Sequence, residues 1–224
     1  MQLEEAKIMF IGIELEKGFA KKFQTQLKNE IKSVLSRSLP SAMSVIKKRI
    51  ATAVKFRISS SPDYQQIAAT EFRGQLGLPD ASVRLEQIVD AWAEGVTVTY
   101  VPSTGAGLGS ITIGILKSGY EDVLALPAAE FNYTNKKGRS NTLQWLRWLL
   151  LEGSQVIIAD FDFREQARGS RTGMGIMVKR RGGGWSVPAN LSGLEHDNFA
   201  TRALQEIEAD IDLIIRQELT KVIK

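Results

Sequence analysis

The spacing of apolar residues changes at Gly95, and this change restricts the chain to a mixed fold. Before Gly95 the apolar residues recur every three or four positions, which is the period of a helix that buries one face. After it, VTVTYVP, ITIGILKS and QVIIADFDF alternate with a period of two, which is typical of half-buried strands. A long helical pattern returns at the end. The sequence therefore predicts an α+β fold: an antiparallel β-sheet flanked by long N-terminal and C-terminal helices, with one helix inserted between strands and extended hairpin loops.

The 224 residues are enough to bury the core of a single domain. No stretch approaches the roughly 18 consecutive apolar residues of a membrane-spanning helix. We expect one α+β domain over residues 1–224. Its parts are a mainly helical region over 1–95, a sheet over 96–188 with the inserted helix at about 141–152, and a C-terminal helix over 197–224.

Helix boundaries follow from proline and from capping residues. Pro40 is expected to end one helix, because proline lacks the backbone N–H that a helix interior needs, and Ser41 is expected to begin the next. Pro62 follows Ser61, which is a helix start signal. Asp197 is the expected cap of the C-terminal helix.

Positive charge is concentrated between Lys17 and Arg57. This stretch holds eight lysines and three arginines against one acid, Glu30, so its balance is +10, whereas the whole chain carries +4. Such a block indicates either an anionic partner, which is nucleic acid, an anionic surface or an acidic protein face, or simply a solvated helix face, and both interpretations stay open. Two apolar stripes run through the stretch, and we expect both to pack in a core, with a membrane-surface helix as the alternative. The stripes are Phe19, Phe23, Leu27 and Ile31, then Met43, Ile46, Ile50 and Val54.

The sequence completes no catalytic or metal-binding pattern. There is no cysteine, which excludes disulfides and thiolate sites, and the single histidine is His196. The glycines of STGAGLGS lead into a strand pattern, whereas a phosphate-binding loop leads into a helix. Asp160 and Asp162 could hold Mg²⁺ in a nuclease, which stays open as an alternative. We expect no enzyme activity, no cofactor and no metal.

The stretch SRTGMGIMVKRRGGGWSVP, residues 170–188, combines glycines with basic residues. The pattern predicts two strands that are joined at Gly182 to Gly184, with Trp185 packed inward and the tip from Lys179 to Gly184 pointing outward. Glycines on one face of a strand allow another backbone or subunit to approach closely. A hairpin of this kind, in a chain without a catalytic pattern, favours a role in assembly. NYTNKKGRSN is expected to be a second exposed loop.

Several segments resemble, in their order, structural proteins of tailed double-stranded DNA phages. TLQWLRWLLLEGSQVII is followed by SRTGMGIMVKRRGGGWSVP and DNFATRAL, and FRGQLGLPDASVRLEQIVDAW lies upstream. The chain resembles the neck or tail-completion proteins, a lambda Z-like head–tail connector family. The resemblance spans roughly Ser60 to Ala203, and its most specific parts are WLRWLL and SRTGMGIM. The basic stretch from Lys17 to Arg57 lies outside it.

This resemblance implies a virion protein that is made in the host cytoplasm and forms a homo-oligomeric ring, of about six or twelve subunits, at the neck. Such a ring joins the head connector to the tail and surrounds the DNA channel. The implied partners are the chain itself, the phage connector or adaptor, the tail terminator or tail tube, and genomic DNA through non-specific contacts, with no membrane. The family supplies no catalytic residues to carry over.

Two alternatives stay open. The first is the tail terminator that caps the tail tube, and the second, of another class, is a basic DNA-binding protein or the Mg²⁺-dependent nuclease. Candidate residues for the subunit interface or the DNA channel are Lys47, Lys48, Arg49, Lys136, Lys137, Arg171, Lys179, Arg180, Arg181 and Trp185.

Overall fold

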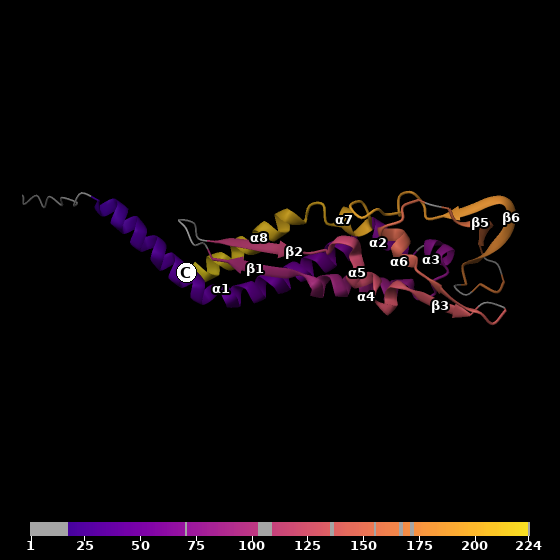
Figure 1. Ribbon diagram of the computed structural model, residues 1–224, viewed down its shortest axis with the longest axis horizontal. Helices are drawn as coiled ribbons and strands as arrows, with labels where there is room; N and C mark the ends of the chain where they lie inside the picture. The colour runs from indigo at the N-terminus through magenta and orange to yellow at the C-terminus, as the bar shows by residue number, and fades with distance from the viewer. Residues whose placement is uncertain are drawn as a thin grey trace, which may run out of the picture.

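The computed structural model is an elongated α+β molecule with 56% helix and 22% strand, which confirms the predicted fold class. Its longest element, α1 (Phe19–Ser60), runs along the body and projects beyond it at one end (Figure 1). None of the helices in the described residues is long and apolar enough to cross a bilayer. The structure describes residues 18–69, 71–102, 109–134, 137–154, 156–165, 168–170 and 173–223.

Helix α1 continues through Pro40 for 42 residues, so the predicted break at this proline is wrong. Ser41 does not cap a new helix, because its hydroxyl donates to the carbonyl of Ser38 at 2.8 Å. Burial on both sides of the proline holds the helix together: Leu39 is 2% exposed and Ala42 is 6% exposed. Figure 1 shows α1 bending where its projecting part meets the body, and a proline ring is a usual cause of such a bend.

The predicted start at Ser61 is confirmed. Its hydroxyl accepts the backbone N–H of Tyr64 at 3.2 Å, and the next helix begins at Pro62. The stretch from Pro62 to about Gly77, whose pattern predicts one helix, forms two short helices, and a third helix follows. These are α2 (Pro62–Ala69), α3 (Glu71–Leu76) and α4 (Ala81–Gly95).

One face of α4 is fully buried. The sequence ASVRLEQIVDAWAEG, residues 81–95, predicts an amphipathic helix that ends at Gly95 with Val83, Ile88, Val89 and Trp92 facing inward. Ile88, Val89 and Trp92 do point inward, each at most 1% exposed. Val83, which was also expected inside, is 54% exposed, so that prediction is wrong. Leu85, two residues later and 0% exposed, takes the inward position instead.

The strands form three separate antiparallel pairs, and not one continuous sheet. The antiparallel pairing itself is confirmed, and short helical turns connect the first two pairs. The pairs are β1 (Thr97–Val101) with β2 (Ser110–Gly114), β3 (Phe131–Thr134) with β4 (Ser140–Leu143), and β5 (Val156–Glu165) with β6 (Gly175–Ser186). The connecting turns are η1 (Ser118–Tyr120), α5 (Glu121–Leu124) and η2 (Pro127–Ala129).

Two predicted boundaries change around the second pair. NYTNKKGRSN is not simply a loop, because its ends belong to β3 and β4. The inserted helix is correspondingly short, since Thr142 and Leu143 extend β4. It is α6 (Trp145–Leu150), which buries Trp145 completely and hydrogen-bonds the indole N–H to the carbonyl of Ala128 at 3.0 Å.

The glycine-rich stretch also folds differently. Residues 179–184 do not form the tip of a hairpin, because they lie inside the single strand β6. Ala159 faces Gly184 and Phe161 faces Lys179, so residues 180–183 bulge opposite Asp160. Asp160 has a positive φ of 59°, and its carboxylate accepts the N–H of Gly182 at 3.1 Å.

The C-terminal region contains two helices, α7 (Phe199–Ala203) and α8 (Ile207–Ile223). Asn198, and not Asp197, caps α7, because the Asn198 side chain accepts the N–H groups of Ala200 and Thr201. The Thr201 hydroxyl in turn accepts the N–H of Asn198 at 2.8 Å, which completes a capping box. The side chain of Asn198 is fully buried, and it fixes α7 against the body.

Candidate assembly interface

Helices α1 and α8 pack side by side in antiparallel register (Figure 1). Arg57 on α1 bonds Asp210 on α8 at 2.8 Å, and Arg49 bonds Glu218 at 2.6 Å. The same register places Ile223, the last described residue, opposite Ser44. Within the described part of the chain, α8 therefore leaves the preceding half of α1 without an antiparallel helix beside it.

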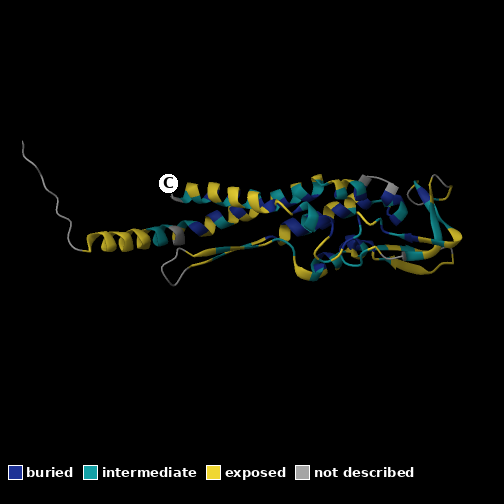
Figure 2. Cartoon of the chain, turned by 90° about the horizontal axis from the view of Figure 1, so that it is seen from above, coloured by how far each residue is buried: buried dark blue, intermediate teal, exposed yellow. Residues whose placement is uncertain are grey.

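This projecting half of α1, defined here as residues 18–38, is the most exposed element of the structure (Figure 2). Its apolar stripe faces solvent: Phe19 is 46% exposed, Phe23 53% and Leu27 49%. The rings of Phe19 and Phe23 stack with their centroids 6.1 Å apart. The prediction that this first stripe packs in the core of its own chain is wrong.

The second stripe does enter the core as predicted. Ile46, Ile50 and Val54 are each 0% exposed. Positions spaced by four lead along α1 from Phe19 to Leu39, which is buried, but each step turns by about 40° around the helix. Leu39 therefore lies on nearly the opposite side of the helix from Phe19, and the exposed stripe and the buried stripe occupy different sides of α1.

The predicted basic residues of α1 divide into two groups. Lys47 and Lys48 are exposed on the body half, and Lys21 and Lys28 are exposed on the projecting half. Arg49 is different, because its guanidinium bonds Glu218 and the side-chain oxygen of Gln217, at 2.6 and 2.7 Å. Arg49 holds α8 against α1, so its charge is engaged within the chain.

The other candidates lie at the opposite end of the molecule (Figure 1). Lys179, Arg180 and Arg181 are exposed on β6, and Arg180 bonds Asp162 at 2.6 Å. Lys137 is exposed between β3 and β4. Trp185 is only 8% exposed and packs against the ring of Phe72, so it is a core residue and not an exposed anchor. Lys136 and Arg171 lie outside the described residues, as do residues 103–108 of the STGAGLGS segment.

Two glycines of this end serve contacts within the chain. A Cβ atom on Gly175 would lie 2.4 Å from the ring of Phe163, and one on Gly74 would lie 2.7 Å from the Cβ of Met174. These glycines let α3 and β5 approach the segment from 174 onward. The close approach of another backbone or subunit that was predicted for the glycines of this strand is made, at Gly175, by β5 of the same chain.

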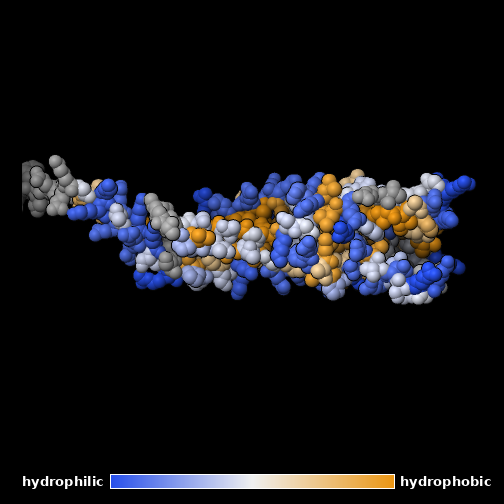
Figure 3. All heavy atoms as spheres, in the orientation of Figure 1, coloured by the Kyte–Doolittle hydropathy of each residue, from blue (hydrophilic) through white to orange (hydrophobic). Residues whose placement is uncertain are grey.

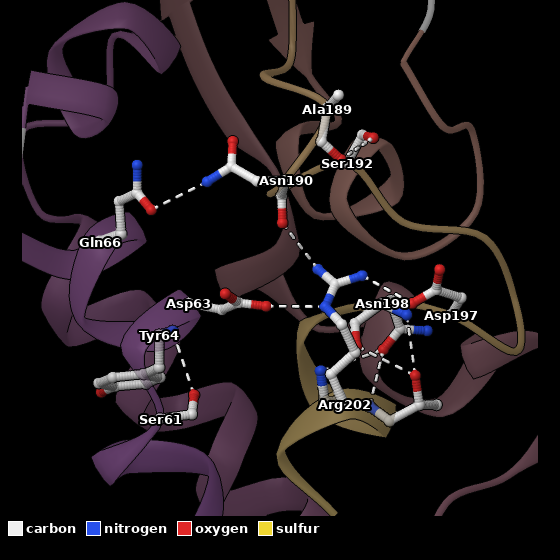
Figure 4. Close-up of polar contacts among 12 residues, drawn as sticks. Ser61, Asp63, Tyr64, Gln66, Ala189, Asn190, Ser192, Asp197, Asn198 and Arg202 are labelled. Atoms are coloured by element: carbon white, nitrogen blue, oxygen red, sulfur yellow. Dashed lines mark hydrogen bonds and ion pairs between the residues drawn. The ribbon is translucent and has the colours of Figure 1, made fainter. Parts of the chain in front are cut away.

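The densest polar cluster surrounds Arg202 (Figure 4). Its guanidinium donates to the carboxylates of Asp63 and Asp197, both at 2.8 Å, and to the carbonyl of Asn190 at 3.0 Å. Two carboxylates compensate one arginine, so the cluster does not attract an anion. Its position between α2, α7 and the segment before α7 indicates a structural role.

The residues considered for catalysis do not assemble into a site. His196 is exposed in the turn before α7. Asp162 is paired with Arg180, and Asp160 accepts a backbone N–H. Across the described ranges, no group of three or more His, Asp or Glu side chains is arranged to hold a metal ion.

A groove of about 380 Å³ lies between α3, β4 and the β5–β6 pair. Its lining is mainly apolar and includes Leu76, Leu143 and Phe161. Nothing on this surface identifies an occupant.

Comparisons with known proteins found no matching family model, no matching curated protein and no matching solved structure. The evidence about function is therefore the sequence resemblance and the geometry. The geometry adds three exposed apolar residues on the α1–α8 pair that sequence analysis missed. They are Val45, Phe56 and Leu213. The only signal in the sequence was that each of these apolar residues lies on the otherwise polar face of its helix, and the two helices are far apart in the chain.

Proposed function

We propose that the chain is a structural subunit that assembles with copies of itself into a ring, and that this ring is part of the neck of a tailed phage virion. The observation that carries the proposal is the projecting half of α1, with its apolar stripe about half exposed. In this proposal the ring joins the head connector to the tail and surrounds the DNA channel. The subunit performs no catalysis.

The projecting half is an unusual element for a chain that acts alone. Helices in proteins are stabilised mainly by packing of an apolar face, and the apolar stripe of the projecting half is about half exposed. Two stacked phenylalanines and a leucine on one face supply such a surface. A partner that covers it would both stabilise the helix and bury the apolar area.

A ring requires two different surfaces on each subunit, because head-to-tail contacts are heterologous. In this proposal the projecting helix at one end of the molecule is one surface, and the second surface lies on the body from which that helix projects (Figure 1). The resemblance over Ser60 to Ala203 covers the part of the body between α1 and α8, and it is the reason for choosing a neck ring over other assemblies. A tail terminator ring stays an alternative of the same structural class.

The direct test is mass photometry of the purified chain over a concentration series, at low and at high salt. Discrete species of about six or twelve subunits, and electron micrographs of closed rings, are expected. A strict monomer across the whole series, together with monomers in the presence of the candidate neck neighbours, would remove the proposal.

Exposed lysines on α1 favour DNA binding as a second candidate. Lys21, Lys28, Lys47 and Lys48 are all exposed on this helix. If they contact phosphates, affinity for duplex DNA falls steeply as salt rises, because bound counterions are released. Charge reversal at Lys47 and Lys48 should then weaken DNA binding and reduce the salt dependence, without changing the folded structure. Arg49 is left unchanged in that variant, because its loss would disturb α8.

A further inference from the structure

A second set of exposed apolar side chains lies on the body half of the α1–α8 pair. Val45 is 44% exposed, Phe56 is 69% exposed and Leu213 is 55% exposed. Val45 precedes Arg49 by four residues, and Phe56 follows Arg49 by seven. Val45, Arg49 and Phe56 therefore share one side of α1. Leu213 precedes Gln217 by four residues on α8.

The hydrogen bond between Arg49 and Gln217 joins these two sides. The antiparallel register also places Leu213 opposite Val54, two residues before Phe56. Val45, Phe56 and Leu213 therefore border one side of the helix pair, and we call them the acceptor face. Two packed helices present ridges and grooves on their shared side, and a third helix can pack onto such a surface.

We propose that the projecting half of α1 packs onto the acceptor face of the next subunit. This inference rests on the proposed ring and names the contact that closes it. The stripe from Phe19 to Leu27 covers about 12 Å of helix, and Val45 to Phe56 covers about 16 Å. The two surfaces are of similar length, and both are helical.

Charge disfavours the pairing of two projecting halves. The projecting half carries five basic residues against Glu30, so two copies of it repel each other. Glu206, in the turn just before α8, supplies an acid beside Arg57 at the Phe56 end of the acceptor face. Glu206 is 87% exposed at its side chain and reaches Arg57 only at 3.9 Å, so its carboxylate can turn to an incoming lysine.

One chain does not bring its own two surfaces together. They lie on the same helix, with Leu27 eighteen residues before Val45, which separates them by about 27 Å along a rigid element. Each copy therefore offers a projecting half to one neighbour and an acceptor face to another, and repetition closes a ring if the angle allows. In the view of Figure 3, the projecting half is mainly hydrophilic, and hydrophobic atoms reach the surface mainly over the body.

Two double variants test the contact. The donor variant, Phe23→Glu with Leu27→Glu, destroys the stripe and keeps the acceptor face. The acceptor variant, Phe56→Lys with Leu213→Lys, does the reverse. All four positions are about half exposed or more, so both variants should keep the wild-type circular dichroism spectrum and melting temperature. The matched control is Val83→Glu, which changes an equally exposed apolar residue on α4.

The expected result is that each double variant alone stays monomeric in mass photometry, while the Val83→Glu control assembles like the wild type. An equimolar mixture of the two double variants should form heterodimers and nothing larger, because only one intact contact is left per pair.

Three outcomes would overturn the inference. Rings of either double variant would show that the contact is not needed. A mixture that stays monomeric while the wild type forms rings would place the subunit contact elsewhere and leave the proposed ring intact. A wild type that never assembles would instead remove the proposed function, and this inference with it.

Discussion

The two halves of α1 have the same apolar spacing and opposite surroundings. Phe19, Phe23 and Leu27 are about half exposed, whereas Ile46, Ile50 and Val54 are fully buried between α8, α4 and β1. Spacing of this kind shows that a helix has an apolar face to bury, but it does not show which element or partner packs against that face. In the body half the cover is supplied by the same chain. In the projecting half, we infer, it is supplied by another copy.

The largest expected difference between the halves is in the stability of the monomer. Ile50→Ala should reduce the free energy of unfolding by about 2–5 kcal/mol, because it removes buried methyl groups and leaves a cavity. The matched change Leu27→Ala should alter it by less than about 0.5 kcal/mol, because its side chain already faces water. Urea unfolding at concentrations where the protein is monomeric measures both. Equal losses would mean that the projecting half packs on its own chain in solution.

Hydrogen exchange should separate the halves next. In the monomer, amides of residues 20–34 should exchange at least about 100-fold faster than those of 46–58, which corresponds to roughly 2.7 kcal/mol less local stability. The reason is that the projecting half has no packed face to hold its turns closed. On assembly its amides should become protected, while those of 46–58 change little. Mass spectrometry of peptides from each half measures these exchange rates. Persistent fast exchange of 20–34 in assembled rings would contradict the role of the projecting half.

A substitution at Pro40, on the boundary between the halves, is expected to have an intermediate effect on stability. Pro40 lies inside α1 and removes one backbone hydrogen bond, so Pro40→Ala should stabilise the monomer by roughly 1–2 kcal/mol. It should also straighten α1 and redirect the projecting half, which small-angle scattering detects as a change in maximum dimension. We expect weaker ring formation despite the more stable monomer. A stabilised variant that assembles as well as the wild type would show that the bend is not needed for the contact.

How well the sequence predicted each helix or strand depends on whether local or long-range interactions determine its structure. α4 was predicted at its observed bounds, because local signals at both ends and a regular stripe agree. The break at Pro40 was wrong because burial of Leu39 and Ala42 on either side overrides the local penalty. The single sheet became three pairs, since an alternating pattern shows that one face is covered and does not identify the neighbouring strand.

The candidate interface was only partly predictable for a related reason. The stripe and the basic stretch of α1 were recognised, but the exposure of the stripe was not, because it depends on where α8 ends relative to α1. The acceptor face was missed entirely. Phe56 and Leu213 are single apolar residues on outer faces, more than 150 positions apart in the sequence, and only the α1–α8 packing joins them. Most such residues on surfaces need no explanation, so neither attracts notice alone.

The smallest predicted effect concerns the ion pairs that end the body half. Hydrogen bonds from Lys221 and Arg49, at 2.7 and 2.6 Å, lower the pKa of Glu218 below its ordinary value of 4.5. Because the pKa is lower in the folded state, Glu218 contributes its full stabilisation above pH 4.5, and this is lost as the pH falls through the lower folded value. Glu218→Gln should therefore lower the melting temperature of the monomer at neutral pH and flatten its fall on acidification. Asp212→Asn, which breaks a pair with Arg216 that is largely exposed, is the control and should change little. If both variants melt alike at every pH, the Arg49–Glu218 contact does not hold α8 on the body half, and the register that leaves the projecting half uncovered loses one of its two anchors.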